Sequence, residues 1–241
     1  MNLFTSEELY VLASLMGLEF IIGVEDRTLE SNRSSLDDLF KKYCKELEDR
    51  GVIEYKIDGT LLVERNIRKS INVLNKSDHA IVVVTDINGN REKANYLKYG
   101  SDYCKLTDKG TSYDLEIIKG FDINSILSRF NISLSGDCVK TLNLSIGSLK
   151  EISDLYNAFD QMEAERKLSE LIQDISVKAV ISECLIKKTK FFVLKEYKRS
   201  GNHMVNTDNL IMRFADQYML SFSVGEGNTV KVSIYQKENQ L

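Results

Sequence analysis

Leu97-Lys98-Tyr99-Gly100 and Met212-Arg213-Phe214-Ala215 decide the fold of this chain, because both stretches belong to a pattern that occurs twice. Each copy alone would leave an open sheet edge, so the repeat predicts two copies of one α+β unit that share a sheet. At the same spacing of 115 residues, and without a gap, further positions pair: Tyr103 with Tyr218, Gly110 with Gly225, Leu115 with Val230 and Ile117 with Val232.

The repeat predicts an α+β fold in which two pseudo-symmetric halves share an antiparallel sheet flanked by helices. We expect a single domain over residues 1–241, with halves at about 1–120 and 145–241 and a connection at 121–144. The chain has 241 residues, of which 43% are apolar, and this is enough to fill a shared core.

In the first half, capping signals and helical spacing predict three helices before the strands. Thr5 and Glu8 form a capping box for a helix that ends near Gly17. After a polar loop over 25–35, Ser34 or Ser35 begins a second helix that ends at Gly51. The elements expected next are a hairpin over 52–63, a helix over about 61–76, a strand over 80–85, an Asn88-Gly89 turn, and extended segments over 96–106 and 113–119.

The second half is expected to follow the same order. A short helix over 123–130 lies in the polar connection, which includes the stretch 133–136. One long amphipathic helix is expected over 149–175, followed by a helix over 177–187, a strand over 191–197, a turn over 200–202, an alternating strand segment over 210–224 and a turn over 225–228. The alternation places Phe214 on one side with the side chains expected to be largely buried: Tyr218, Leu220, Phe222, Val230 and Val232.

Charge and hydropathy favour a cytoplasmic protein whose partners are proteins. The net charge is −4 and the pI is about 5.4, which would repel nucleic acid and an anionic membrane at long range. The N-terminus lacks a signal-peptide pattern, and no apolar run approaches the length that spans a bilayer. We therefore expect no nucleic-acid partner and no membrane insertion.

The residue types that catalysis and metal binding require are scarce. The two histidines, His79 and His203, lack a second ligand at metal-binding spacing or a cysteine that would form a dyad. The four cysteines occur singly, which disfavours both zinc and a disulfide framework. Gly225-x-Gly227 precedes a strand rather than a helix, so it is a turn and not a phosphate-binding loop. We expect a protein that is not an enzyme and has no cofactor, no metal site and no catalytic residue.

In the N-terminal half, a helix from Thr5 to Gly17 is followed by a helix that ends in Leu47-x-x-Arg50-Gly51-Val52-Ile53, a helix up to Leu74 and a strand from Ala80. This order of elements resembles the EspG family of cytosolic chaperones of mycobacterial type VII secretion. The segments 97–118 and 212–232 resemble the two pseudo-symmetric sheet halves of that family. The resemblance implies a chaperone or adaptor that handles a helical type VII substrate, of the WXG or LXG type, before export. This sequence departs from the mycobacterial pattern in having no proline.

A chaperone of this kind would hold its substrate through an exposed apolar patch. The candidate partner-binding residues are Gly89 and Gly225, in two sheet turns, and Phe159 and Met162, on the amphipathic helix.

Two alternative functions stay open. A cytosolic immunity protein that neutralises a toxin would also be small, acidic and without catalytic residues. A winged-helix DNA-binding protein would use residues 34–63, although the charges there nearly cancel.

Overall fold

The computed structural model of this chain describes residues 3–24, 33–128, 138–186, 190–201, 203–214 and 218–236. Several expectations involve residues outside these ranges: most of the loop over 25–35, the stretch 133–136, the ends of the helices over 123–130 and 177–187, Asn202 of the 200–202 turn, Ala215 of the repeated motif and residues 215–217 of the segment 210–224.

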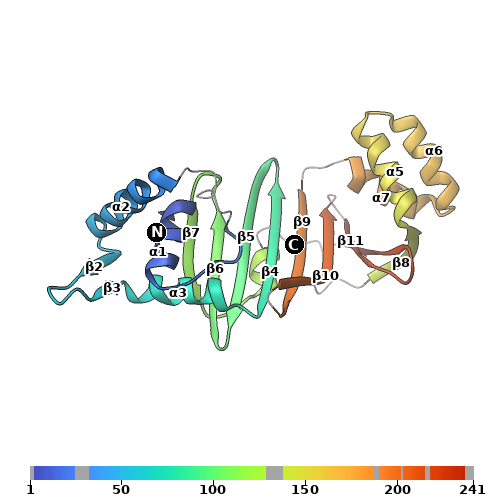
Figure 1. The fold of residues 1–241 in the computed structure, drawn as a ribbon. Helices are drawn as coiled ribbons and strands as arrows, with labels where there is room; N and C mark the ends of the chain where they lie inside the picture. Colours follow the sequence, from blue (N-terminus) through green and yellow to red (C-terminus); the bar gives the residue numbers. More distant parts are fainter. Residues whose placement is uncertain are drawn as a thin grey trace. The chain divides into compact units, whose positions relative to one another are not determined.

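Ten strands form one antiparallel sheet in the order β1-β7-β6-β5-β4-β9-β10-β11-β12-β8, and β2 and β3 form a separate hairpin (Figure 1). The strands are β1 Leu3–Phe4, β2 Ile53–Tyr55, β3 Leu61–Val63, β4 His79–Ile87, β5 Asn90–Tyr99, β6 Asp102–Asp108, β7 Tyr113–Ile118, β8 Cys138–Ser145, β9 Lys190–Ser200, β10 His203–Phe214, β11 Tyr218–Val224 and β12 Thr229–Gln236.

The described residues contain seven helices, and the predicted α+β class with a shared antiparallel sheet is confirmed. The helices are α1 Ser6–Leu15, α2 Arg33–Asp49, α3 Arg65–Lys76, α4 Ile123–Ser128, α5 Ile146–Asn157, α6 Gln161–Leu171 and α7 Ile175–Ile186.

The chain forms two compact units. Unit 1 comprises residues 1–82, 92–121 and 196–205, and unit 2 comprises 83–91, 122–195 and 206–241. Strands β4 and β9 each contribute residues to both units, as do β5 and β10. The single-domain organisation with a connection at 121–144 stays a prediction.

The element order repeats as one strand, three helices and four strands. In the first copy, β1, α1, α2 and α3 precede β4 to β7, with the β2–β3 hairpin inserted before α3. In the second copy, β8, α5, α6 and α7 precede β9 to β12. The start of each copy is also repeated, because the outermost strands β1 and β8 lead directly into the helices α1 and α5, which Thr5 and Ser145 cap.

The strand register corrects the spacing of the repeat from 115 residues to 116 or 117. Leu97 pairs with Cys104 in the first copy, and Arg213 pairs with Leu220 in the second, which is a shift of 116. Across the next pair of strands, Leu106 faces Leu115 and Phe222 faces Val232, so the last strand is shifted by 117. A gapless spacing of 115 is therefore wrong by one residue for β10 and β11, which puts their side chains on opposite sheet faces from their counterparts, and by two residues for β12.

The turn before the last strand of each copy accounts for the extra residue. Lys109 N donates to Ser112 O at 2.9 Å in the first copy, and Gly225 N donates to Thr229 O at 3.0 Å in the second, so the second turn is one residue longer. Gly110 and Gly227 both have positive φ, at 86° and 64°. The counterpart of Gly110 is thus Gly227 and not Gly225.

Four further expectations differ from the structure. The segment 96–106 is interrupted by a turn at Gly100, where φ is 61°, and the segment 210–224 also belongs to two strands, β10 and β11. The polar connection contains a strand that the sequence does not predict, β8, most of whose side chains are exposed or only partly buried. The expected helix over 149–175 is two helices, α5 and α6.

Each unit contains its own buried apolar cluster. In unit 1, helices α1, α2 and α3 pack against β6 and β7 around Leu12, Leu47 and Ile71. In unit 2, α5, α6 and α7 pack against β8, β11 and β12 around Ile152, Leu168 and Ile181. Leu220 and Val232 are fully buried there as predicted, whereas Tyr218, Phe222 and Val230 are only partly buried.

The Leu47–Ile53 motif closes α2 and ties it to the N-terminus. Val52 N donates to Leu47 O at 2.9 Å, and Gly51 adopts a φ of 68°, as expected for a helix C-terminus. The Arg50 guanidinium donates to Glu8 Oε1 at 2.5 Å and to Leu3 O at 2.6 Å. It also lies 4.9 Å from the centre of the Phe4 ring. Arg50 therefore has a structural role.

Candidate functional site

Phe159 stands at the break between α5 and α6 with its side chain in solvent. Its φ is 63°, a left-handed conformation that a phenylalanine adopts at a cost of about 1–2 kcal/mol. The side chain is 94% exposed, and that of Met162 in the first turn of α6 is 84% exposed. Neither side chain contributes to the core, so packing does not explain two large apolar residues at this corner.

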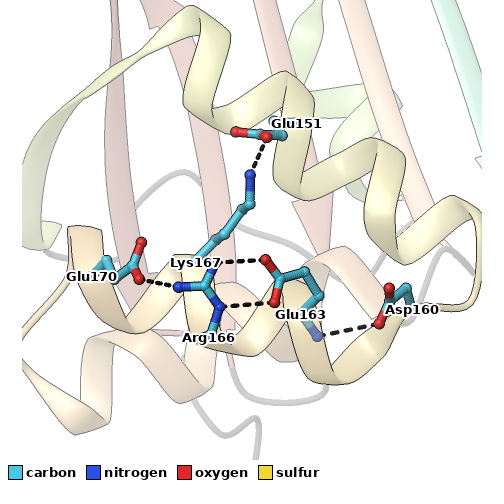
Figure 2. Close-up of polar contacts among 6 residues, drawn as sticks. All are labelled: Glu151, Asp160, Glu163, Arg166, Lys167 and Glu170. Atoms are coloured by element: carbon cyan, nitrogen blue, oxygen red, sulfur yellow. Dashed lines mark hydrogen bonds and ion pairs between the residues drawn. The ribbon is translucent and has the colours of Figure 1, made fainter.

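Polar contacts fix the geometry of the α5–α6 corner (Figure 2). Asp160 caps α6 by accepting from Glu163 N at 3.3 Å. Lys167 of α6 forms an ion pair with Glu151 of α5, and Arg166 pairs with both Glu163 and Glu170 along α6. The corner that presents Phe159 and Met162 is thus cross-linked from both helices.

A second set of polar contacts joins helices α5, α6 and α7 of unit 2. The Tyr156 hydroxyl lies 2.9 Å from Glu165 Oε1 and 3.0 Å from Ser182 Oγ, and Ser182 also contacts Glu165. Burial, together with the Glu165 carboxylate, raises the pKa of Tyr156 to about 12. These residues come from α5, α6 and α7, so the cluster sets the positions of the helices on the sheet.

An apolar groove of about 290 Å³ lies at the other end of α5, between this helix and strands β10, β11 and β12. The helix begins there because Ser145 caps it and because Ile146 N donates to Asn228 O at 3.2 Å, which ties α5 to the β11–β12 turn. The walls include exposed apolar side chains, of which Val224 is 69% exposed. The lining residues are Ile146, Leu149, Lys150, Ser153, Leu185, Asn209, Ile211, Arg213, Phe222, Ser223, Val224, Thr229 and Val230.

Among the described residues that line the groove, the two charged ones are both cations, Lys150 and Arg213. Arg213 is half-buried, and burial lowers the pKa of its guanidinium below the usual range, although an arginine keeps its charge at neutral pH. Within the described ranges, no carboxylate forms an ion pair with Arg213. A desolvated cation beside an apolar wall is a place where an anionic group of a ligand would be favoured.

The groove and the corner are connected along α5. A shallow hollow lined by Gly147, Lys150, Glu151, Asp154, Leu155 and Ala158 shares Lys150 with the groove and ends next to Phe159. We call the groove, this hollow and the pair Phe159 and Met162 the α5 track. The twelve residues of α5 make the track about 18 Å long.

The predicted partner-binding residues divide into three places. Phe159 and Met162 form the corner end of the α5 track. Gly225 lies between Val224 and the 226–229 turn at the groove end, where a Cβ would come within 2.5 Å of Thr229 Oγ1. Gly89 lies in the β4–β5 turn with a φ of 85°, and it does not line either hollow.

The prediction missed the groove lining, including Ile146, Ile211 and Arg213. No sequence signal singled out these residues, because they come together from a helix and a strand more than fifty residues apart along the chain. The prediction also missed the exposed apolar side chains of the β2–β3 hairpin in unit 1, which are Tyr55, Ile57 and Leu62.

Neither a metal-binding cluster nor a membrane-spanning helix occurs among the residues that the structure describes. No group of three or more His, Cys, Asp or Glu side chains could hold a metal ion there. Among the same residues, no helix is long and apolar enough to cross a membrane.

The fold is EspG-like. The structure is similar to that of the type VII secretion system chaperone EspG5 of Mycobacterium tuberculosis, solved in complex with a PE25–PPE41 dimer, with a TM-score of 0.68. The similarity covers 99% of this chain and 91% of that chain, at 10% sequence identity. No protein-family model and no curated protein matches the sequence.

Proposed function

We propose that this protein is a non-catalytic cytoplasmic chaperone or adaptor that binds a helical substrate of type VII secretion, of the WXG or LXG type. Two lines of support converge. The EspG-like fold covers nearly the whole chain, and EspG5 was solved with a PE25–PPE41 dimer bound. The α5 track supplies an apolar surface of the kind that an amphipathic helix occupies.

The observation that carries the proposal is the exposure of Phe159 in a left-handed conformation. Stability alone disfavours a large apolar side chain that is both strained and unburied. A partner that covers this ring on binding would provide the missing burial. Exposed aromatic and methionine side chains are also the residue types that most often anchor protein interfaces.

The test is coexpression of the full chain with a helical secretion substrate encoded beside it in the native genome. The expected result is one complex that survives gel filtration at about 0.5 M salt, where the screening length falls well below about 10 Å and contacts between exposed charges are weak. Apolar burial is not screened in this way. Elution as separate peaks, with export unaffected by deletion of the gene, would contradict the proposal and would leave the immunity-protein interpretation to be tested with the toxic domain.

The matched variants compare two exposed apolar sites. The double substitution Phe159→Ser and Met162→Ser is expected to weaken the complex at least about tenfold, which corresponds to about 1.4 kcal/mol. The substitution Ile57→Ser on the β2–β3 hairpin removes an equally exposed apolar side chain of unit 1 and serves as the control. Equal loss in both would show non-specific apolar binding rather than binding at the α5 track.

A further inference from the structure

We infer that the groove at the N-terminal end of α5 selects a helix that carries an acidic side chain beside its apolar anchors. In this inference, the Arg213 guanidinium binds the carboxylate of that side chain. The inference rests on the proposed function, because it specifies the chemistry of the partner bound at the same track. Its basis is the charge and the position of Arg213 within the groove.

Arg213 differs in chemistry from the residue at the equivalent position of the first copy of the repeat. Its counterpart in the first copy is Leu97, since Leu97 pairs with Cys104 as Arg213 pairs with Leu220. Leu97 is fully buried in the core of unit 1. The same site in unit 2 therefore holds a cation that lines an open groove, where internal packing would favour an apolar residue.

The residues around Arg213 favour the binding of an anionic group that belongs to a partner. Lys150 is the second cation of the groove, and no acidic side chain occurs among the lining residues that the structure describes. The N-terminus of α5 opens on the same groove through Ile146 and adds a partial positive charge. This arrangement is local, because the chain as a whole carries a net charge of −4.

The shape of the track favours a helix over a compact ligand. The groove of about 290 Å³ accommodates a few apolar side chains, and the hollow extends from Lys150 to Ala158 beside Phe159. A length of about 18 Å corresponds to about three turns of a docked helix, which would place anchors at i, i+3, i+4 and i+7. An acid at the end of such a helix would reach Arg213.

The experiment measures binding of fluorescent synthetic peptides to the full chain. The peptides form one amphipathic helix of about four turns with leucines at the anchor spacing, and they differ at one flanking position that is Glu, Gln or Lys. The wild type is expected to bind the Glu peptide about tenfold or more tightly than the Gln peptide, and the Lys peptide more weakly still. The preference for Glu should shrink as the salt concentration rises.

The substitution Arg213→Met should abolish the preference for Glu while it retains affinity for the Gln peptide. Arg91→Met, at an exposed arginine of unit 2, is the matched control and should keep the preference. Because Arg213 is half-buried, Val224→Glu provides a second test at an exposed wall residue, where an added carboxylate should repel the Glu peptide about tenfold.

The outcomes separate this inference from the proposed function. An unchanged Glu-to-Gln ratio in Arg213→Met, or no binding of any peptide, overturns the inference even if a secretion substrate copurifies. Tight binding of decanoate that competes with the Glu peptide would also overturn it, because the groove would then be a site for a small carboxylic acid. Selective peptide binding without copurification of a secretion substrate would support the inference and contradict the proposed export role.

Discussion

At the scale of single residues, replacement of Phe159 by glycine is expected to affect the stability of the fold and the binding of a partner in opposite directions. Substitution by glycine relieves a backbone strain of about 1–2 kcal/mol, and greater freedom of the unfolded chain offsets about 0.5–1 kcal/mol of this gain. We therefore expect Phe159→Gly to raise the free energy of unfolding by about 0–1.5 kcal/mol in urea denaturation, while partner binding falls. Phe159→Tyr should preserve both properties. A loss of stability greater than about 1 kcal/mol in Phe159→Gly would show that the ring packs inside the protein.

Substitutions of Leu220 and Phe222 by alanine test, also at the scale of single residues, how much each side chain contributes to the stability of the unit 2 core. Leu220 is fully buried between the helices and the sheet of unit 2, so Leu220→Ala is expected to lower the free energy of unfolding by about 2–5 kcal/mol. Phe222 is only partly buried and lines the groove, so Phe222→Ala should cost less than a full phenylalanine deletion of about 3–5 kcal/mol. Chemical denaturation of both variants measures the difference, and an equal loss would place Phe222 in the closed core.

At the scale of secondary-structure elements, Asp174 joins the edge strand β8 to the start of α7. Its carboxylate accepts from Lys140 Nζ at 2.5 Å and from the backbone N–H groups of Ser176 and Val177 at 3.1 and 3.2 Å. The hydrogen bond from Lys140, and then those at the helix start, hold the pKa of Asp174 well below its usual range.

This lowered pKa predicts a pH-dependent effect of Asp174→Asn. A depressed folded-state pKa contributes stability above the unfolded-state pKa, and the contribution disappears as the pH falls through the folded-state value. We expect the variant to melt at a lower temperature than the wild type at neutral pH, and the gap to narrow steadily below about pH 4. Thermal unfolding followed by circular dichroism at several pH values measures the gap. A gap that stays constant with pH would mean that the carboxylate charge has no stabilising role.

At the scale of the whole molecule, the two copies of the repeat share topology but differ in what they leave exposed. The first copy fills the Leu97 position with a buried leucine, and the second copy places Arg213 there beside an open groove. We therefore expect partner binding to involve unit 2. Hydrogen exchange should slow at residues 146–153 and 224–230 when the partner is added, whereas α3 in unit 1 should exchange at an unchanged rate. Protection confined to the β2–β3 hairpin would instead place the partner on unit 1.

Much of the local structure follows from neighbouring residues along the chain. The capping box of Thr5 and Glu8 predicts the start of α1, and the structure contains both of its hydrogen bonds. The Asn88-Gly89 turn likewise has positive φ at both residues, as a tight hairpin requires. The α5–α6 break was missed because apolar spacing continues across it, while the local capping signal of Asp160 was overlooked.

The sequence by itself determined the α+β class and the position of local signals such as the Thr5 cap and the Asn88-Gly89 turn, because caps, turn residues and alternation act over a few neighbouring residues. Only the tertiary structure decided which sheet face each side chain occupies. A shift of one residue in register reverses that face, and one extra residue in the 225–229 turn is enough to change the shift. The register between β10 and β11, in which Arg213 pairs with Leu220 and Phe214 with Met219, sets Arg213, and not Phe214, beside α5 in the groove. The candidate site depends on such contacts between distant segments, which no local pattern specifies.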